Sequence, residues 1–261
     1  MLFHPCSTAL NFRLSGKLWE NVPLGYGVLR LGLFSDIECR TVAAAAFTTG
    51  GLVQTGDPLS DLPEDRLLLQ SKVVPSIDKG SMRLNLWDKE DSVLFFRKDL
   101  EGKAGKWNAL TILNLQDFKQ PFKFALSGST IKDLDAKEFA VVDMNSFEFK
   151  GIFQKGSEFD CGDIEPHGSR VLLVFPLPET EKVPFFIASD IHYSGGADQV
   201  SGIKLSGQQL EVTLSSRWHK KVTLLGGIRE NGVYRFVTRV AQCNGSNVSA
   251  VLNFQSDSDN K

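Results

Sequence analysis

The chain has 261 residues, of which 42% are hydrophobic and 23% are charged, and its formal net charge is −2. This composition is typical of a globular protein, and the near balance of charges argues against a nucleic-acid partner, which would need clustered Lys and Arg. No segment approaches the ~20 consecutive apolar residues of a membrane span, so no membrane partner is expected.

The first strong helical signal begins at Ser35. Ser35 and Glu38 have the spacing of a capping box, in which each side chain bonds the backbone amide of the other residue. Apolar residues follow at helical spacing as far as Phe47. A helix is therefore predicted from about Asp36 to Thr48, ended by the glycine pair that starts at Gly50.

A short strand at 52–54, a loop through Asp57 and a second helix at 62–74 are predicted next. Asp61 and Glu64 have the spacing of a second capping box. Helix, strand, loop and helix with short connections are typical of a (β/α)8 barrel, in which the loop after a strand faces the active-site rim.

The pattern changes after Pro75. Residues 82–86, 122–126 and 210–214 alternate between apolar and polar side chains, as half-buried strands do. Further short strands are predicted at 93–97, 107–115, 139–142, 147–153, 171–175, 185–188, 222–225, 234–238 and 248–254. Many short strands without a helical pattern predict an antiparallel β-sandwich.

The run from Thr49 to Leu69, closed by Lys72–Pro75, resembles the last barrel strand and last helix of melibiase-type α-galactosidases, glycoside hydrolase family 36 and its relatives. Gly16–Leu24 occupies the place of that family's Leu-Trp-x-Asn-Asp-Pro-Asp segment. Where the family pattern has two acidic residues, this sequence has Val22 and Leu24.

The strand region carries the same resemblance. Four segments are similar to the sandwich that follows the barrel in these enzymes, namely Leu86–Asp88, Trp107–Asn114, Ala140–Asp143 and Ile164–Val174. The resemblance implies a mainly β chain: the incomplete C-terminal end of a (β/α)8 barrel at 1–78, then a β-sandwich at 79–255 with a second sheet extension from about residue 180.

The functional expectation from the resemblance is the C-terminal portion of an α-galactosidase-like glycoside hydrolase acting on α-linked galactosides or related sugars. A glycosidase needs two carboxyl groups flanking the scissile bond. In the family both are aspartates on earlier barrel strands, so they are expected upstream and no catalytic residue is assigned here. The alternative is a non-catalytic carbohydrate-binding or structural β-sandwich module that keeps a barrel remnant as its base.

Three residues are candidates for contact with a carbohydrate, namely Trp19, Asn21 and Asp57. An aromatic face stacks on the apolar side of a sugar ring, and an amide bonds its hydroxyls. Packing between barrel and sandwich is an equally good interpretation of Trp19. For Asp57, a turn residue before Pro58 is the simpler interpretation.

No cofactor and no metal site is predicted. His167 reads as a turn residue, and Asp190 with His192 reads as a surface hydrogen bond rather than as a metal pair, because no further ligands follow at matched spacing. The cysteines are too sparse for a disulfide framework, and buried free thiols are expected.

One further partner is expected, which is a second copy of the chain. The apolar helix faces around Ala43–Phe47 and Leu67–Leu69 would pack on neighbouring units in a complete barrel. Without those units, the chain is predicted either to self-associate through residues 1–75 or to be markedly less stable there than in its sandwich.

Overall fold

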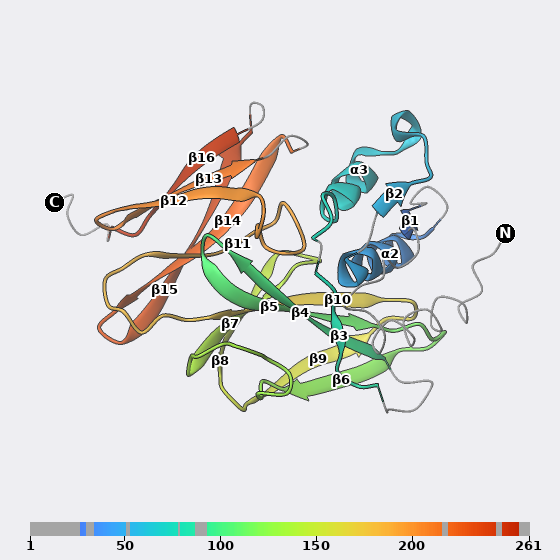
Figure 1. The fold of residues 1–261 in the computed structure, drawn as a ribbon, viewed down its shortest axis with the longest axis horizontal. Coiled ribbons are helices and arrows are strands. Elements are labelled where there is room, and N and C mark those ends of the chain that lie inside the picture. The colour runs from blue at the N-terminus through green and yellow to red at the C-terminus, as the bar shows by residue number, and fades with distance from the viewer. Residues whose placement is uncertain are drawn as a thin grey trace.

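The structure is a computed structural model that describes residues 27–29, 34–50, 53–77, 79–86, 93–215, 219–243 and 247–255. Its first segment contains β1 (Gly27–Leu29), α2 (Asp36–Thr49), β2 (Val53–Thr55), the 3-10 helix η1 (Leu59–Asp61) and α3 (Glu64–Ser71). β1 and β2 are parallel neighbours, and α2 connects them (Figure 1). These elements form one βαβ unit.

The predicted cap of α2 is confirmed. The Glu38 amide donates to Ser35 Oγ at 3.4 Å, and the Ser35 amide donates to the Glu38 carboxylate at 2.9 Å. Gly50 ends the helix in the left-handed conformation, with φ of 65°. Both ends of this helix therefore follow from local sequence.

The second predicted capping box is wrong. Asp61 ends η1, where its carboxylate accepts a hydrogen bond from the Ser60 hydroxyl, and α3 begins after Pro63 without a side-chain cap. The reason is that Leu62 is buried, which places the helix start two residues later than the box requires. The helix also stops at Ser71, because the chain then passes into the sandwich, where Val73 is buried.

The first sandwich contains a six-stranded sheet in the order β3-β4-β5-β10-β7-β8, and a two-stranded sheet of β6 and β9. Their bounds are β3 (Met82–Arg83), β4 (Leu94–Gly102), β5 (Gly105–Leu113), β6 (Gln120–Ala125), β7 (Glu138–Asp143), β8 (Glu148–Gln154), β9 (Glu158–Ile164) and β10 (Ser169–Pro176). All pairings within these two sheets are antiparallel.

Both faces of the six-stranded sheet are covered. On one face Phe95 and Ile112 pack with Phe124 and Phe159 of the two-stranded sheet. On the other face Phe96 and other strand residues pack with α2 and with the segment after β11. Figure 1 shows α2 lying over β10 and β5, with β1, β2 and α3 beyond it. Two covered faces explain why the central strands are buried almost continuously instead of alternately.

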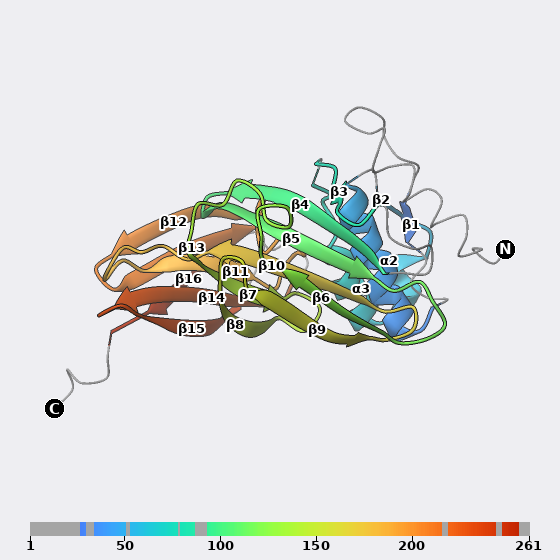
Figure 2. The same ribbon diagram turned by 90° about the horizontal axis from the view of Figure 1, so that it is seen from below.

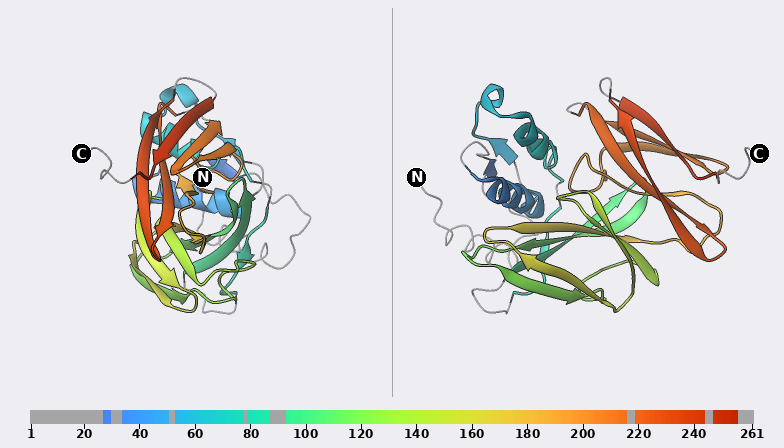
Figure 3. Two further views of the ribbon diagram at one scale, coloured as in Figure 1. Left: turned by 90° about the vertical axis from the view of Figure 1, so that its left-hand side faces the viewer. Right: turned by 180° about the vertical axis from the view of Figure 1, so that it is seen from behind.

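The second sandwich packs the sheet β11-β14-β15 against the sheet β12-β13-β16. Its strands are β11 (Phe185–Ser189), β12 (Val200–Ser206), β13 (Gln209–Ser215), β14 (Lys221–Glu230), β15 (Val233–Gln242) and β16 (Asn247–Asn253). Burial alternates along β13 and β16, as in strands with one face toward a core. Figures 2 and 3 show this sandwich and the α2–α3 segment at opposite ends of the long axis.

The prediction of a mainly β chain with antiparallel sheets is confirmed. Both α-helices of the described residues precede Pro75, as predicted, and neither is long and apolar enough to cross a membrane. β9 and β12 were not predicted, because Glu158, Asp160 and Asp163 in β9, and Ser201 and Gly202 in β12, interrupt the apolar pattern. The barrel units implied by the resemblance remain a prediction.

Candidate functional site

The three predicted carbohydrate contacts are not brought together within the described residues. Asp57 is half-buried in the connection between β2 and η1. Trp19 and Asn21 lie outside the described residues. All three remain predictions. Buried polar side chains are found instead in the loop between β11 and β12.

A buried loop connects β11 to β12 and contains the most unusual polar environment. Residues 191–197 are all buried, although connecting segments normally run over the protein surface. The loop is inserted between α2, the segment after α3 and the six-stranded sheet, as its packing partners in the core show. We call residues 190–199 the junction loop.

His192 in the junction loop is fully buried. The Ser194 amide donates to its Nδ1 at 3.1 Å, and Ser194 Oγ lies 2.9 Å from the same atom. A backbone amide can only donate, so Nδ1 carries no proton and the neutral ring has its hydrogen on Nε2. The predicted surface hydrogen bond is therefore wrong, because the loop that holds this side chain lies in the core.

The surroundings of His192 disfavour its charged form. Burial lowers the pKa of the imidazole to about 4, and the Lys98 ammonium acts in the same direction. Within the part of the chain that the structure describes, Nε2 makes no hydrogen bond of ordinary geometry, although the backbone of Val73 and Pro75 lies close enough to favour the charged ring. The imidazole is neutral at pH 7.

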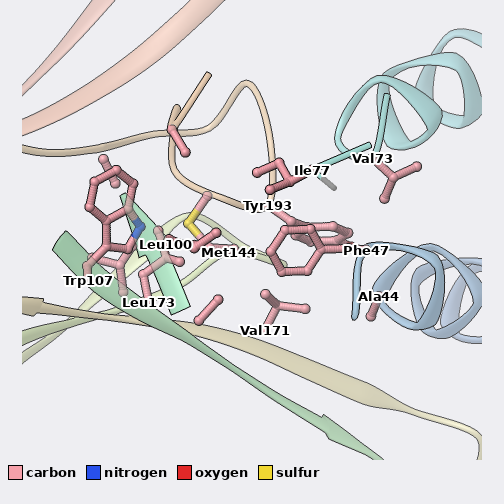
Figure 4. Close-up of a cluster of buried hydrophobic side chains, with 14 of the residues drawn as sticks. Ala44, Phe47, Val73, Ile77, Leu100, Trp107, Met144, Val171, Leu173 and Tyr193 are labelled. Carbon is pink, nitrogen blue, oxygen red and sulfur yellow. The ribbon is translucent and has the colours of Figure 1, made fainter. Parts of the chain in front are cut away.

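Tyr193 is the next residue and is also fully buried, and its hydroxyl has no hydrogen-bond partner among the described residues. Its ring packs against Phe47 of α2 with 5.8 Å between centroids, and Figure 4 shows the two rings side by side. Its amide donates to the Lys72 carbonyl at 2.9 Å. Burial raises the pKa of the phenol, so the ring is a neutral packing element rather than an acid or base.

Lys72 follows α3 and points toward the same region. Its ammonium donates to the Met144 carbonyl at 2.8 Å and lies 5.5 Å from the Tyr193 ring centroid. Burial lowers the pKa of Lys72, while Asp190 and Asp143 oppose that shift. These contacts bind the end of α3 to both sandwiches.

The junction loop is also fixed to β5. The Trp107 indole N–H donates to the Ser194 carbonyl at 2.9 Å. Gly195 has a φ of 74°, and a Cβ built on it would lie 2.5 Å from Leu173 Cδ1. A larger residue here would strain the backbone and would have to displace the buried Leu173 side chain, which favours glycine.

The remaining candidates have structural roles. His167 occupies a turn, as predicted, with a φ of 52° and its Nε2 2.8 Å from Asp117 Oδ1. Asp190 accepts the Thr223 amide at 2.8 Å. Among the described residues no group of three or more His, Cys, Asp or Glu could hold a metal ion. The contacts of the junction loop and of Lys72 connect the two sandwiches with the α2–α3 segment.

The cysteines of the described residues agree with the expectation of free thiols. Cys39, Cys161 and Cys243 form no disulfide, and Cys39 is buried while the other two are half-buried. Burial raises the pKa of Cys161 to about 12, so its reactive thiolate is absent at neutral pH.

No protein-family model and no curated protein matches the sequence. Among solved structures, α-galactosidase I from Mortierella vinacea aligns with 59% of this chain and 39% of its own, at 16% identity and a TM-score of 0.47. A β-L-arabinopyranosidase of glycoside hydrolase family 27 from Geobacillus stearothermophilus aligns with 57% of this chain and 32% of its own, at 19% identity and a TM-score of 0.44.

The α-galactosidase of Saccharomyces cerevisiae, solved with raffinose, aligns with 59% of this chain and 46% of its own, at 12% identity and a TM-score of 0.46. The chain thus spans less than half the length of each of these three enzymes. None of the three is named as a family 36 enzyme.

Sequence reasoning missed the junction loop. Its residues His192, Tyr193 and Ser194 are followed by two glycines, a composition typical of a surface turn. The available signal was the large aromatic residue beside the glycine pair, since paired glycines also mark a close approach of two backbones.

Proposed function

We propose that this chain is the C-terminal portion of an α-galactosidase-like glycoside hydrolase that acts on α-linked galactosides or related sugars. The observation that supports it most directly is the β1-α2-β2 unit resting on an antiparallel sandwich. A βαβ unit followed by such a sandwich is the order that the sequence resemblance implies. Two parallel strands alone are not a stable sheet, and parallel sheets are covered on both faces.

In this proposal the domains are a barrel end at 1–78 and the sandwich at 79–255, with a second sandwich from about residue 180. The sandwich then serves as the base that holds α2, the helix before the last barrel strand, in place. Thr41 of α2 donates its hydroxyl to the His167 carbonyl at 2.6 Å, and Lys98 of β4 donates to the Phe47 carbonyl at 2.6 Å. α2 is thereby bonded to the first sandwich at its middle and in its last turn.

The proposed sugar contacts are Trp19, Asn21 and Asp57, with the two catalytic aspartates upstream. Asp57 follows β2, and a residue after a barrel strand faces the active-site rim. Its carboxylate would accept hydrogen bonds from sugar hydroxyls, while Trp19 would stack on the ring and Asn21 would bond its edge.

The test is to recover the reading frame upstream of this chain and to assay the whole product and the isolated chain with an aryl α-galactoside. We expect the whole product to hydrolyse it through two facing barrel aspartates, and the isolated chain to show no turnover. An upstream frame that encodes no such strands would overturn the proposal and favour a non-catalytic carbohydrate-binding or structural module.

The rim assignment needs variants in the whole product. Asp57→Asn is expected to raise KM for the aryl α-galactoside, because it removes an acceptor for sugar hydroxyls. Asp61→Asn is the matched control, since Asp61 is an exposed aspartate four residues away in η1. Equal kinetics for both variants would exclude Asp57 from the sugar site. Turnover by the isolated chain that disappears with Asp57→Asn would make this carboxylate catalytic instead.

A further inference from the structure

The hydrogen bonds around His192 leave no room for a second proton on its ring. Nδ1 faces two donors, the Ser194 amide at 3.1 Å and the Ser194 hydroxyl at 2.9 Å. The hydroxyl oxygen already accepts the amides of Gly196 at 3.3 Å and Ala197 at 3.1 Å, so its own proton is directed at Nδ1. A proton on Nδ1 would meet the amide of Ser194, which cannot reverse its direction.

The groups around the ring make protonation costlier still. β4 contributes the Lys98 ammonium, a fixed cation that acts on the imidazole. α2 contributes the apolar ring of Phe47, which lies edge-on at 5.8 Å from the imidazole. The backbone of Val73 and Pro75, in the segment after α3, acts in the opposite direction and favours the charged ring, but burial and Lys98 outweigh it. Tyr193 and Ser194 flank the ring within its own loop. A charged imidazole would be a second buried cation beside Lys98.

We propose that His192 is an acid-sensitive latch, and that its protonation on Nδ1 releases the junction loop from α2 and β5. Accepting the proton requires the Ser194 amide to turn away, and Ser194 is also the residue whose carbonyl holds the Trp107 indole. The Tyr193 amide, bonded to the Lys72 carbonyl, belongs to the same short segment. Release of the loop therefore loosens the second sandwich from the α2–α3 segment.

Acidification opens the junction loop, and neutral pH keeps it closed. The closed loop holds the imidazole with a pKa of about 4, whereas an opened loop exposes a ring of ordinary pKa 6.5. The closed form is favoured fully above pH 6.5 and loses its advantage as the pH falls toward 4. The opening equilibrium is then expected to rise about 20-fold at pH 5 and about 120-fold at pH 4, relative to pH 7.

The experiment is hydrogen exchange of the full chain at pH 7, 5 and 4, normalised to intrinsic rates and read for peptides that cover residues 190–200. We expect exchange of this loop to accelerate by those factors, while the central strands β5 and β10 change little. His192→Asn keeps an acceptor near the position of Nδ1 and cannot take up a proton in this range, so its loop exchange should not vary with pH.

The matched control is His167→Asn. It removes a histidine from a half-exposed turn where φ is 52°, a conformation that asparagine tolerates. It should retain the full acid response. Equal acid responses in the two variants, or none in the unmodified chain, would overturn the proposal.

A second measurement keeps the proposal testable if His192→Asn does not fold. Nitrogen-15 NMR of the imidazoles in the unmodified chain distinguishes a ring protonated on Nε2 alone from a doubly protonated ring. We expect the His192 signal to show the neutral Nε2–H form down to about pH 5 and to change together with loop exchange. A ring that titrates near 6.5 while the loop stays protected would overturn the latch. Neither measurement depends on glycosidase activity. The proposed function and the latch can therefore be overturned independently of each other.

Discussion

The Lys98 ammonium of β4 lies 2.6 Å from the carbonyl oxygen of Phe47, in the last turn of α2. It also lies 3.4 Å from the Ile77 carbonyl and 4.8 Å from the centroid of the Phe47 ring. The last carbonyls of a helix lack partners within the helix and carry the negative end of its dipole. A strand of the sandwich thus supplies the cation for the C-terminus of the helix that rests on it.

Replacing Lys98 with methionine tests this contact. Lys98→Met keeps most of the volume but leaves the buried Phe47 carbonyl without its donor, so we expect the free energy of unfolding to fall by about 1–3 kcal/mol. The measurement is urea denaturation, with Lys106→Met as the control, because Lys106 is exposed on the neighbouring strand β5. An equal and small effect in both variants would mean that the charge at the helix end contributes nothing.

Local sequence predicted those features that depend on local chemistry. The capping box of α2, the glycine that ends it and most strand positions are set by neighbouring residues, so composition and spacing sufficed. The burial of Lys98 was not predictable, since a charged residue within Arg97–Asp99 reads as solvent-facing until α2 covers the second face of the sheet. The burial of the junction loop was not predictable for the same reason, because only tertiary packing places it in the core.

The capping box of α2 predicts a dependence of stability on pH. The hydroxyl and the amide of Ser35 both bond the Glu38 carboxylate, and they lower the pKa of Glu38 below its ordinary value of 4.5. A lowered folded-state pKa contributes stability above the unfolded value, and this contribution is lost as the pH falls through the folded-state pKa.

The difference in unfolding free energy between Glu38→Gln and the unmodified chain should therefore become smaller as the pH falls. At pH 7 we expect the variant to be less stable by about 0.3–1 kcal/mol, because glutamine can keep the capping hydrogen bond but loses the negative charge at the helix N-terminus. Near pH 3 the two chains should unfold at similar urea concentrations. Asp65→Asn, an exposed carboxylate in the first turn of α3, is the control. A gap that stays constant from pH 7 to 3 would contradict this account.

A single methyl group added at Gly195 is expected to lower the free energy of unfolding strongly. Gly195→Ala combines an unfavourable φ of 74° with a Cβ position 2.5 Å from Leu173 Cδ1. Gly207→Ala has the same kind of backbone, with φ of 58°, but no atom within 4 Å of its Cβ. The backbone cost of about 1 kcal/mol is common to both, so the difference between them isolates the steric clash.

We expect Gly195→Ala to lose a further 1–3 kcal/mol of unfolding free energy, the usual cost of overpacking a core. Urea denaturation of the two variants side by side measures the difference. Equal losses would show that the junction loop can yield by several tenths of an ångström without cost, and would argue against its role as a rigid connection.

Self-association remains a prediction, and the structure narrows the surface that could carry it. α2 is covered, since Ala43, Ala44 and Phe47 are all buried. α3 is not covered to the same degree, because Leu67 and Leu68 keep 37% and 38% of their surface exposed. Burial of a few hundred Å² of apolar area at ~25 cal/mol per Å² would contribute several kcal/mol to association.

We therefore expect the sedimentation coefficient of the chain to rise with concentration, and the variant Leu67→Ser with Leu68→Ser to remain monomeric. The control is Val233→Ser with Val240→Ser, which changes two valines of β15 that are 68% and 51% exposed. This control should associate like the unmodified chain, because its changes lie on the second sandwich. A chain that is monomeric at every concentration, with α3 protected from hydrogen exchange as strongly as the central strands, would show that this segment needs no partner.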